Sequence, residues 1–120
     1  MGSQETAAVG AYGERVAEAH LRAQGMVILD RNWRCTAGEL DIVARDGDVL
    51  VFCEVKTRRG TGFGWPLEAV TASKAARLRR LAAAWTREHG LHLTDLRIDL
   101  VGVLRPPRGP AQIEHVRGVA

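Results

Sequence analysis

The Asp-Gly dipeptide at positions 46 and 47 is the feature that most constrains the fold. It separates two runs rich in apolar residues, 39–45 and 48–58. Asp-Gly between such runs is the strongest short-range signal of a β-hairpin. A two-residue loop at this point pairs Arg45 with Asp48, so that Asp41 faces Phe52 and Glu39 faces Glu54.

This register sorts the hairpin side chains into two faces, because successive residues of a strand point to opposite sides. One face is entirely apolar and is predicted to be core: Leu40, Ile42, Ala44, Val49, Val51, Cys53 and Val55. The other face is apolar near the turn and polar at its far end: Glu39, Asp41, Val43, Leu50, Phe52, Glu54 and Lys56. Asp41 and Glu54 are predicted to be diagonal neighbours, with backbones roughly 5–8 Å apart.

Carboxylates held this close repel each other and need a cation to stay ionised. A divalent ion supplies that charge, and Mg²⁺ prefers one or two carboxylates together with waters and phosphate oxygens. Lys56 projects to the same side as Glu54, and lysine is rare here, at two of the seventeen Lys and Arg residues. A compact ammonium at this place can stabilise charge in a phosphoryl-transfer transition state. The alternative is a structural strand end, with Lys56 paired to Glu54 or Glu39.

The rest of the chain predicts helices around these strands. Residues 5–24 and 71–89 have apolar residues at helical spacing, and Thr71 is a plausible N-cap of the second helix. A strand begins at Met26-Val-Ile-Leu29 and runs toward Trp33, and further strands are predicted at 96–104 and 112–116. The order of helix, three strands, helix, strand, strand predicts an α/β domain with a mixed sheet flanked by helices. At 120 residues, a single domain over 1–120 is expected.

Composition excludes several classes of protein. No apolar run reaches the roughly 18–20 residues of a membrane span, and the first residues do not resemble a secretory signal. Cys35 and Cys53 are expected to be buried or half-buried free thiols in a reducing cytoplasm. The net charge of +3 hides an asymmetry, because residues 1–60 carry eight cations and nine anions, whereas residues 61–120 carry nine cations and five anions.

Several spaced motifs together resemble the YraN family of bacterial proteins, over about residues 9–116. They are Gly10-x-x-Gly13-Glu14, Asn32-Trp33-Arg34-Cys35, Gly38-Glu39-Leu40-Asp41, Val51-Phe52-Cys53-Glu54-Val55-Lys56-Thr57-Arg58, Phe63-Gly64, Val70, Lys74 and Arg97-Ile98-Asp99. That family is regarded as predicted endonucleases of the PD-(D/E)XK type, similar to archaeal Holliday-junction resolvases. The resemblance implies a restriction-endonuclease-like core with Asp41, Glu54 and Lys56 as catalytic residues. It also implies that Glu14 joins Asp41 and Glu54 as a metal ligand.

Other residues have competing interpretations. Glu14 could instead be a boundary residue paired with Arg15 or Arg22, and Glu39 could support the metal ligands from outside. Asp99 is expected to form a structural salt bridge with Arg97, and His115 is expected to be structural. The basic second helix is either a solvated surface or a nucleic-acid interface. In the preceding loop, Phe63 and Trp65 could stack on unpaired bases, or Trp65 and Pro66 could simply pin the loop to the core. The predicted nucleic-acid contacts are Arg58, Arg59, Lys74, Arg77 and Arg80.

Two functions are therefore in competition. The first is an endonuclease dependent on Mg²⁺, with Mn²⁺ as the alternative ion, that cuts structured or branched DNA. A homodimer would supply the two cuts that a junction needs. The second is a non-catalytic protein of nuclease fold that binds nucleic acid or a DNA-processing partner.

Overall fold

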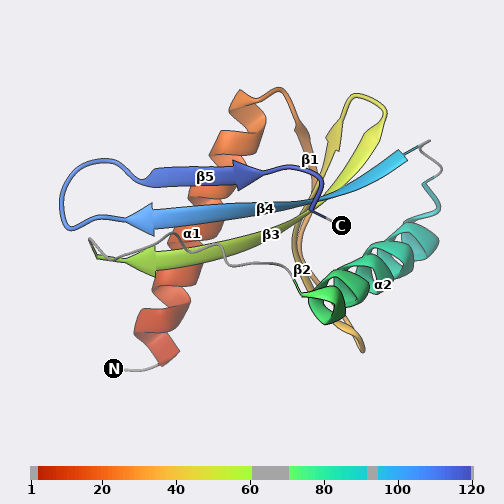
Figure 1. Cartoon of the computed structure of the whole chain (residues 1–120), viewed down its shortest axis with the longest axis horizontal. Helices are drawn as coiled ribbons and strands as arrows, with labels where there is room; N and C mark the ends of the chain where they lie inside the picture. The colour runs from red at the N-terminus through yellow and green to blue at the C-terminus, as the bar shows by residue number, and fades with distance from the viewer. Residues whose placement is uncertain (1–2, 61–70, 92–94, 120) are drawn as a thin grey trace.

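A five-stranded sheet with one helix on each face forms the framework of the chain (Figure 1), in a computed structural model that describes residues 3–60, 71–91 and 95–119. The elements are α1 (Ser3–Ala23), β1 (Val27–Cys35), β2 (Gly38–Asp46), β3 (Val49–Arg59), α2 (Ala72–His89), β4 (Asp95–Arg105) and β5 (Gln112–Val116). The predicted element order and the α/β class are confirmed. Of the helices in the described ranges, none is long and apolar enough to cross a membrane.

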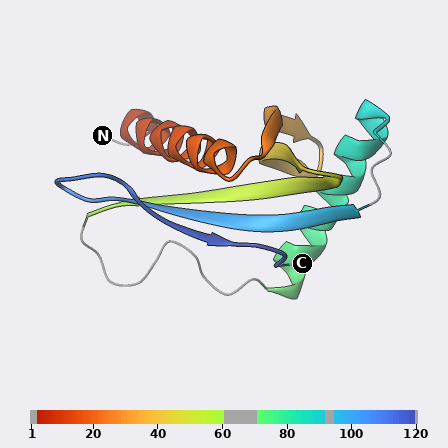
Figure 2. The ribbon, with the colours of Figure 1, turned by 90° about the horizontal axis from the view of Figure 1, so that it is seen from above.

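The sheet is mixed, as predicted. Its strands lie in the order β1-β2-β3-β4-β5, and every neighbouring pair is antiparallel except β3 and β4. Parallel neighbours need a crossover connection, and the segment between β3 and β4 contains α2. Seen from above, α1 lies along one face of the sheet and α2 against the other (Figure 2).

The second helix has the caps that the sequence predicts. The Thr71 side chain accepts a hydrogen bond from the Lys74 N–H, and Gly90 ends the helix in the left-handed region with φ 62°. The apolar stripe of α2 faces the sheet through Ala75, Leu78, Leu81, Ala82 and Trp85. The position of Lys74 and Arg77 at the start of α2 is therefore set by both the cap and the core.

The hairpin register differs from the prediction by two residues. Asp46 pairs with Val49, so the loop is Gly47-Asp48 and not Asp46-Gly47. Gly47 has φ 60°, which suits glycine at the first position of a two-residue hairpin loop. The β2–β3 ladder extends to Ile42 opposite Cys53. A shift of two preserves the parity of the faces, and continuing this register by one residue puts Asp41 opposite Glu54 instead of diagonal to it.

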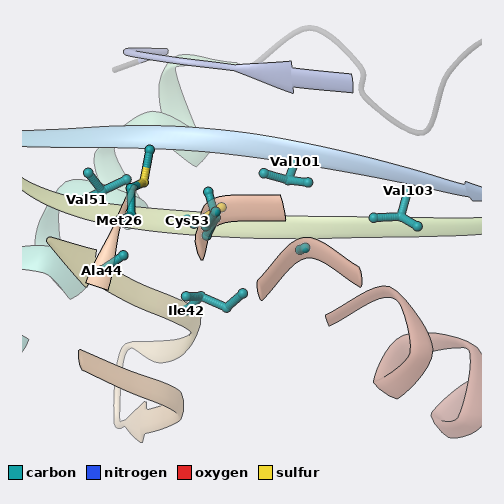
Figure 3. Packing of buried hydrophobic residues seen from close by; sticks show 9 residues of the cluster. Met26, Ile42, Ala44, Val51, Cys53, Val101 and Val103 are labelled. Atoms are coloured by element: carbon teal, nitrogen blue, oxygen red, sulfur yellow. The ribbon is translucent and has the colours of Figure 1, made fainter. Parts of the chain in front are cut away.

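Two hydrophobic clusters fill the two faces of the sheet. Figure 3 shows the one beneath α1, which consists of Ala17, Leu21, Met26, Ile42, Ala44, Val51, Cys53, Val101 and Val103. The cluster beneath α2 consists of Leu40, Val43, Leu50, Phe52, Leu78, Leu81, Ala82, Trp85 and Ile98. Both cysteines are free, with Cys53 buried and Cys35 half-buried, as predicted.

Leu40 is on the opposite face from the one predicted. It belongs to the cluster beneath α2, whereas Ile42 belongs to the cluster beneath α1. The β1–β2 register passes from Arg31 opposite Ile42 to Trp33 opposite Leu40, and Asn32 between them has φ 49°. This left-handed residue twists the ribbon, so simple alternation of faces fails at Asp41.

A buried ionic network joins α1, β4 and β5. Asp99 has 0% exposure and accepts hydrogen bonds from Arg97 Nε at 2.9 Å and from the Gly118 N–H at 3.1 Å. His115 Nε2 lies 2.8 Å from Asp99, and His115 Nδ1 lies 3.0 Å from His20 Nε2 on α1. The predicted Asp99–Arg97 salt bridge is confirmed, and His115 lies in the same network.

This network predicts that folding weakens in acid. Burial, His115 and Arg117 lower the pKa of His20, so the folded state binds its proton less readily than the unfolded state. The free energy of unfolding should therefore fall as pH drops below about 6.5. Burial would raise the pKa of Asp99, but hydrogen bonds from Arg97 and His115 lower it, so a second loss is expected below about 3.8.

Urea unfolding at pH 7 and pH 5 measures the first loss. The His20→Gln variant should lose less stability between these pH values than the wild type. His89→Gln is the comparison variant, because His89 stacks on Trp85 outside this network. Equal slopes in the wild type and His20→Gln would contradict the prediction.

Candidate active site

Asp41 lies where the ladder between β2 and β3 ends. Its Oδ2 accepts a hydrogen bond of 2.8 Å from the Val55 N–H, so the carboxylate is held by the main chain of the neighbouring strand. Burial, together with the charges of Glu14, Glu54 and Glu39, outweighs the lowering effect of the Val55 hydrogen bond and raises the pKa of Asp41 to about 6. The carboxylate of Asp41 is therefore electrostatically coupled to three others.

Glu14 approaches the same place from α1. Burial and the charge of Glu39 raise the pKa of Glu14, while a side-chain hydrogen bond with Asn32 lowers it. Gly13 explains how the helix comes this close, because a Cβ at position 13 would lie 1.7 Å from Thr57 Oγ1 and 2.7 Å from Thr57 Cβ. The glycine therefore lets α1 rest directly on β3, next to Glu14.

A cavity of about 590 Å³ opens between α1 and the β1–β2 ribbon. Glu14, Asn32 and Asp41 line it, together with arginines from α1 and β1. Arg31 is bound by both carboxylate oxygens of Glu18, which also lines the cavity. Among the ion pairs of the described residues, none joins Glu14 to its predicted partners Arg15 and Arg22, and Arg22 pairs instead with Glu18 at 3.0 Å. The cavity thus gives Glu14 and Asp41 a shared, accessible space.

Glu54 contacts the opposite helix. Lys74 Nζ lies 2.7 Å from its Oε2, and Arg77 Nη2 lies 3.4 Å from its Oε1. The Glu54 side chain is only 13% exposed. No donor in the described residues is aligned on the buried Oε2 as a hydrogen bond, so Lys74 neutralises this oxygen by charge alone.

Lys56 is exposed on β3, two residues beyond Glu54. Its predicted structural partners do not hold it, because Glu54 is bound by α2 and Glu39 pairs with Arg34 at 2.7 Å. The prediction that Glu39 faces Glu54 is wrong, because the β2–β3 register is shifted by two residues and its ladder ends with Ile42 opposite Cys53. Glu39 still raises the pKa of Asp41 and Glu14, so it influences the site from outside.

The predicted nucleic-acid contacts fall into two groups. Lys74 and Arg77 are engaged by Glu54, whereas Arg80 is exposed one turn further along α2. Arg58 and Arg59 are exposed at the carboxyl end of β3. The loop residues Phe63 and Trp65, which the sequence suggested as a stacking surface, lie outside the described residues.

The donor chemistry of this site fits a hard divalent cation. Mg²⁺ is commonly held by one or two carboxylates, and the coupled pair of Asp41 and Glu54 provides them. Glu54 Oε2 is buried without an aligned hydrogen bond, which leaves a lone pair for a cation. In residues 3–60, 71–91 and 95–119, however, no three carboxylate, histidine or cysteine side chains gather closely enough to form a ready metal-binding group.

Asn32 is a site residue that the sequence reasoning missed. Its side chain lowers the pKa of Glu14, it lines the cavity, and its φ of 49° twists the ribbon at Asp41. The available signal was an Asn within an apolar-aromatic strand, because Asn tolerates the left-handed region better than most residues. The contact of Glu54 with α2 had no comparable local signal.

Comparison with known proteins gives a consistent set of relatives. Residues 13–103 match the Uncharacterised protein family UPF0102. A UPF0102 protein of a Nocardioides species is 61% identical over 112 residues, covering 93% of this chain and 90% of its own. One from Streptomyces coelicolor is 60% identical over 115 residues, covering 94% and 88%.

Among solved structures, a Holliday junction resolvase from Archaeoglobus fulgidus aligns with a TM-score of 0.46 at 20% identity, covering 87% of this chain and 74% of that one. The residues matched to the family include Glu14, Asp41, Glu54 and Lys56.

Proposed function

This chain belongs to the UPF0102 family, the family its YraN-like motifs indicated, and on that premise we propose that it is a divalent-metal-dependent endonuclease acting on structured or branched DNA. One observation supports this most strongly. Asp41 is held by the Val55 N–H in a half-buried position where three other carboxylates oppose its ionisation. A divalent cation bound there would relieve the repulsion among these carboxylates, and phosphodiester hydrolysis is a reaction that uses such a cation.

Each residue of the site has a distinct role in this proposal. Asp41 and Glu54 would hold the metal ion, and Glu14 would complete its surroundings from α1. When bound, the ion supplies Lewis-acid polarisation of the scissile phosphate. Lys56 is exposed on β3, two residues beyond Glu54, and would bring an ammonium to the phosphate oxygens, where it would stabilise the added negative charge. Glu39 would not bind the metal ion, but its negative charge raises the pKa of Asp41 and of Glu14.

The cation-rich surface on α2 supports binding of the substrate backbone. The first turn of α2 contains no acidic residue, and Arg80 is exposed on the following turn. Arginine and lysine contact nucleic-acid phosphates without regard to sequence, and such contacts make binding dependent on salt. Recognition of shape, as at a branch point, is compatible with this kind of surface.

The second candidate is a non-catalytic nuclease-fold protein that binds nucleic acid or a DNA-processing partner. The ion pairs of Glu54 with Lys74 and Arg77 favour it, because a carboxylate neutralised by the protein itself has less need of a metal. In that case Arg80→Glu should abolish binding, while Glu54→Gln should leave function intact.

The decisive experiment is a cleavage assay with four-way junctions, flaps, single strands and linear duplexes, in Mg²⁺ or Mn²⁺. We expect cleavage of branched substrates in the presence of metal only, and a loss of about 10²-fold or more in Lys56→Met. Arg45→Met is the matched control, because Arg45 is an exposed cation on β2 near the turn and should leave the rate unchanged.

Cleavage of none of these substrates with either ion would contradict the nuclease proposal. Retained junction binding, abolished by Arg80→Glu, would then support the second candidate. Sedimentation of the protein with and without a junction would test the expected homodimer.

A further inference from the structure

Within the described residues, Glu54 is the proposed metal ligand whose carboxylate forms ion pairs with cations of the protein. Lys74 Nζ lies 2.7 Å from Oε2, and Arg77 Nη2 lies 3.4 Å from Oε1, so each oxygen has its own cation. The Lys74 side chain is 28% exposed and the Arg77 side chain 44%, whereas Glu54 is 13% exposed. The carboxylate is thus more buried than the two cations that approach it from the solvent side.

The place of these cations on α2 is unusual. Lys74 is in the first turn, where the positive end of the helix dipole disfavours a cation, and no acid in that turn offsets it. Thr71 caps the helix at Lys74, and Ala75 and Leu78 are buried in the core, so the backbone beneath Lys74 and Arg77 is anchored. The attraction of Glu54 therefore compensates for a locally unfavourable position of Lys74.

Lys74 and a divalent ion compete for the same oxygen of Glu54. An inner-sphere Mg²⁺ lies about 2.0–2.1 Å from its ligand oxygen, and an ammonium 2.7 Å from that oxygen would be strongly repelled. The lysine side chain is a flexible four-carbon stem, so it can leave without moving the helix. Once released, Lys74 and Arg77 lie on the same flank of α2 as exposed cations beside the site.

We propose that Lys74 and Arg77 occupy Glu54 in the metal-free protein and are displaced by the divalent ion, which frees them to bind nucleic-acid phosphates. This inference rests on the proposed function and adds its regulation. Metal and nucleic acid then favour each other's binding. The metal takes Glu54 away from the two cations, and nucleic-acid phosphates take the two cations away from Glu54. By linkage, the factor by which metal tightens nucleic-acid binding equals the factor by which nucleic acid tightens metal binding.

The first arm of the test measures metal binding without activity. Calorimetric titration of Mn²⁺ into Lys74→Met should show binding about 5- to 30-fold tighter than in the wild type, because the competitor for Glu54 has been removed. Arg79→Met is the matched control, since it removes an exposed cation from the same helix and should leave the affinity unchanged. Equal affinities in Lys74→Met and the wild type would overturn the proposed competition and leave the nuclease proposal standing.

The second arm measures DNA binding in EDTA, where no cleavage can occur. Glu54→Gln frees both cations without metal, so it should bind a labelled four-way junction more tightly than the wild type. The slope of log affinity against log salt should steepen by about one to two, as expected for one or two added phosphate contacts. Adding Lys74→Met to Glu54→Gln should reverse much of the gain.

Two controls separate release of the cations from simple loss of negative charge. Asp41→Asn removes a neighbouring charge but leaves Lys74 and Arg77 on Glu54, and Glu88→Gln removes a charge that is 61% exposed near the end of α2. If either control raises the affinity and the salt slope as much as Glu54→Gln does, the proposal is overturned. If no variant binds the junction or Mn²⁺, the proposed function fails together with it.

Discussion

Replacing Asp41 with asparagine is expected to abolish metal-dependent cleavage and, in the metal-free protein at pH 7, to stabilise the fold. The loss of cleavage should be about 10²-fold or more, because a neutral amide is a much poorer ligand for a divalent ion. The gain in stability follows from the raised pKa of Asp41, about 6 against an ordinary 3.8. Asparagine can still accept the Val55 hydrogen bond without the charge.

The sign of this effect depends on pH. Because the folded-state pKa of Asp41 lies above the unfolded value, its contribution to stability is lost as pH rises from about 3.8 to about 6. At pH 7 Asp41 is ionised, and the folded wild type bears the full unfavourable free energy of that buried charge. Asp41→Asn should therefore be more stable by about 1–3 kcal/mol, or roughly 4–12 °C in Tm. At pH 4 the difference should nearly vanish.

Thermal denaturation in EDTA at the two pH values measures this difference. Asp48→Asn is the control, since it neutralises an exposed carboxylate in the loop of the same hairpin and should change stability by less than about 0.5 kcal/mol. Added Mg²⁺ should raise the Tm of the wild type but not that of Asp41→Asn. A destabilised Asp41→Asn at pH 7 would show that the clustered carboxylates do not strain the fold.

Replacing Gly13 with alanine is expected to destabilise the protein strongly although it adds one methyl group. The new Cβ would lie 2.7 Å from Thr57 Cβ and 2.8 Å from Thr57 Cγ2, so rotating the threonine cannot remove the clash. Forcing α1 away from β3 should cost about 1–3 kcal/mol, as overpacking of a core does. Cleavage should fall as well, since Glu14 is the next residue and moves with the helix.

Gly10→Ala provides a matched control on the same helix. No atom lies within 4 Å of a Cβ built at position 10, so alanine should be neutral or stabilising by up to about 1 kcal/mol through its higher helix propensity. In a double-mutant cycle measured by urea unfolding, Thr57→Gly should relieve much of the Gly13→Ala effect. Independent, additive effects of the two substitutions would refute the close approach of α1 to β3.

The sequence was most informative where local rules decide the structure. The Asp-Gly turn located the hairpin, and the caps at Thr71 and Gly90 located α2 within a residue. The loop nevertheless formed one residue later than expected, because Gly47 suits the first loop position and Asp46 continues the strand. Because the register shift was two residues, the prediction of which residues share a face stayed correct near the turn.

Features that depend on tertiary contacts could not be predicted in this way. The reversal at Leu40 follows from the left-handed twist at Asn32, and the partners of Glu54 come from a helix twenty residues away in sequence. Spacing predicted that Asp41, Glu54 and Lys56 lie near one another, but nothing local showed that Glu54 contacts α2 while Asp41 lines the cavity beneath α1. Those orientations are set by how each helix packs on its own face of the sheet.

The position of the proposed site at the end of the β2–β3 ladder determines how its activity should respond to local unfolding. Asp41 and Glu14 depend on the core beneath α1, whereas Glu54 depends on the core beneath α2. A site assembled from both faces of the sheet requires both cores to be intact at the same moment. It therefore forms only while α1 and α2 are both packed on the sheet. Local opening of either helix, well short of global unfolding, is then enough to disassemble it. Heat or a destabilising mutation should abolish the proposed activity before the central strands β3 and β4 unfold.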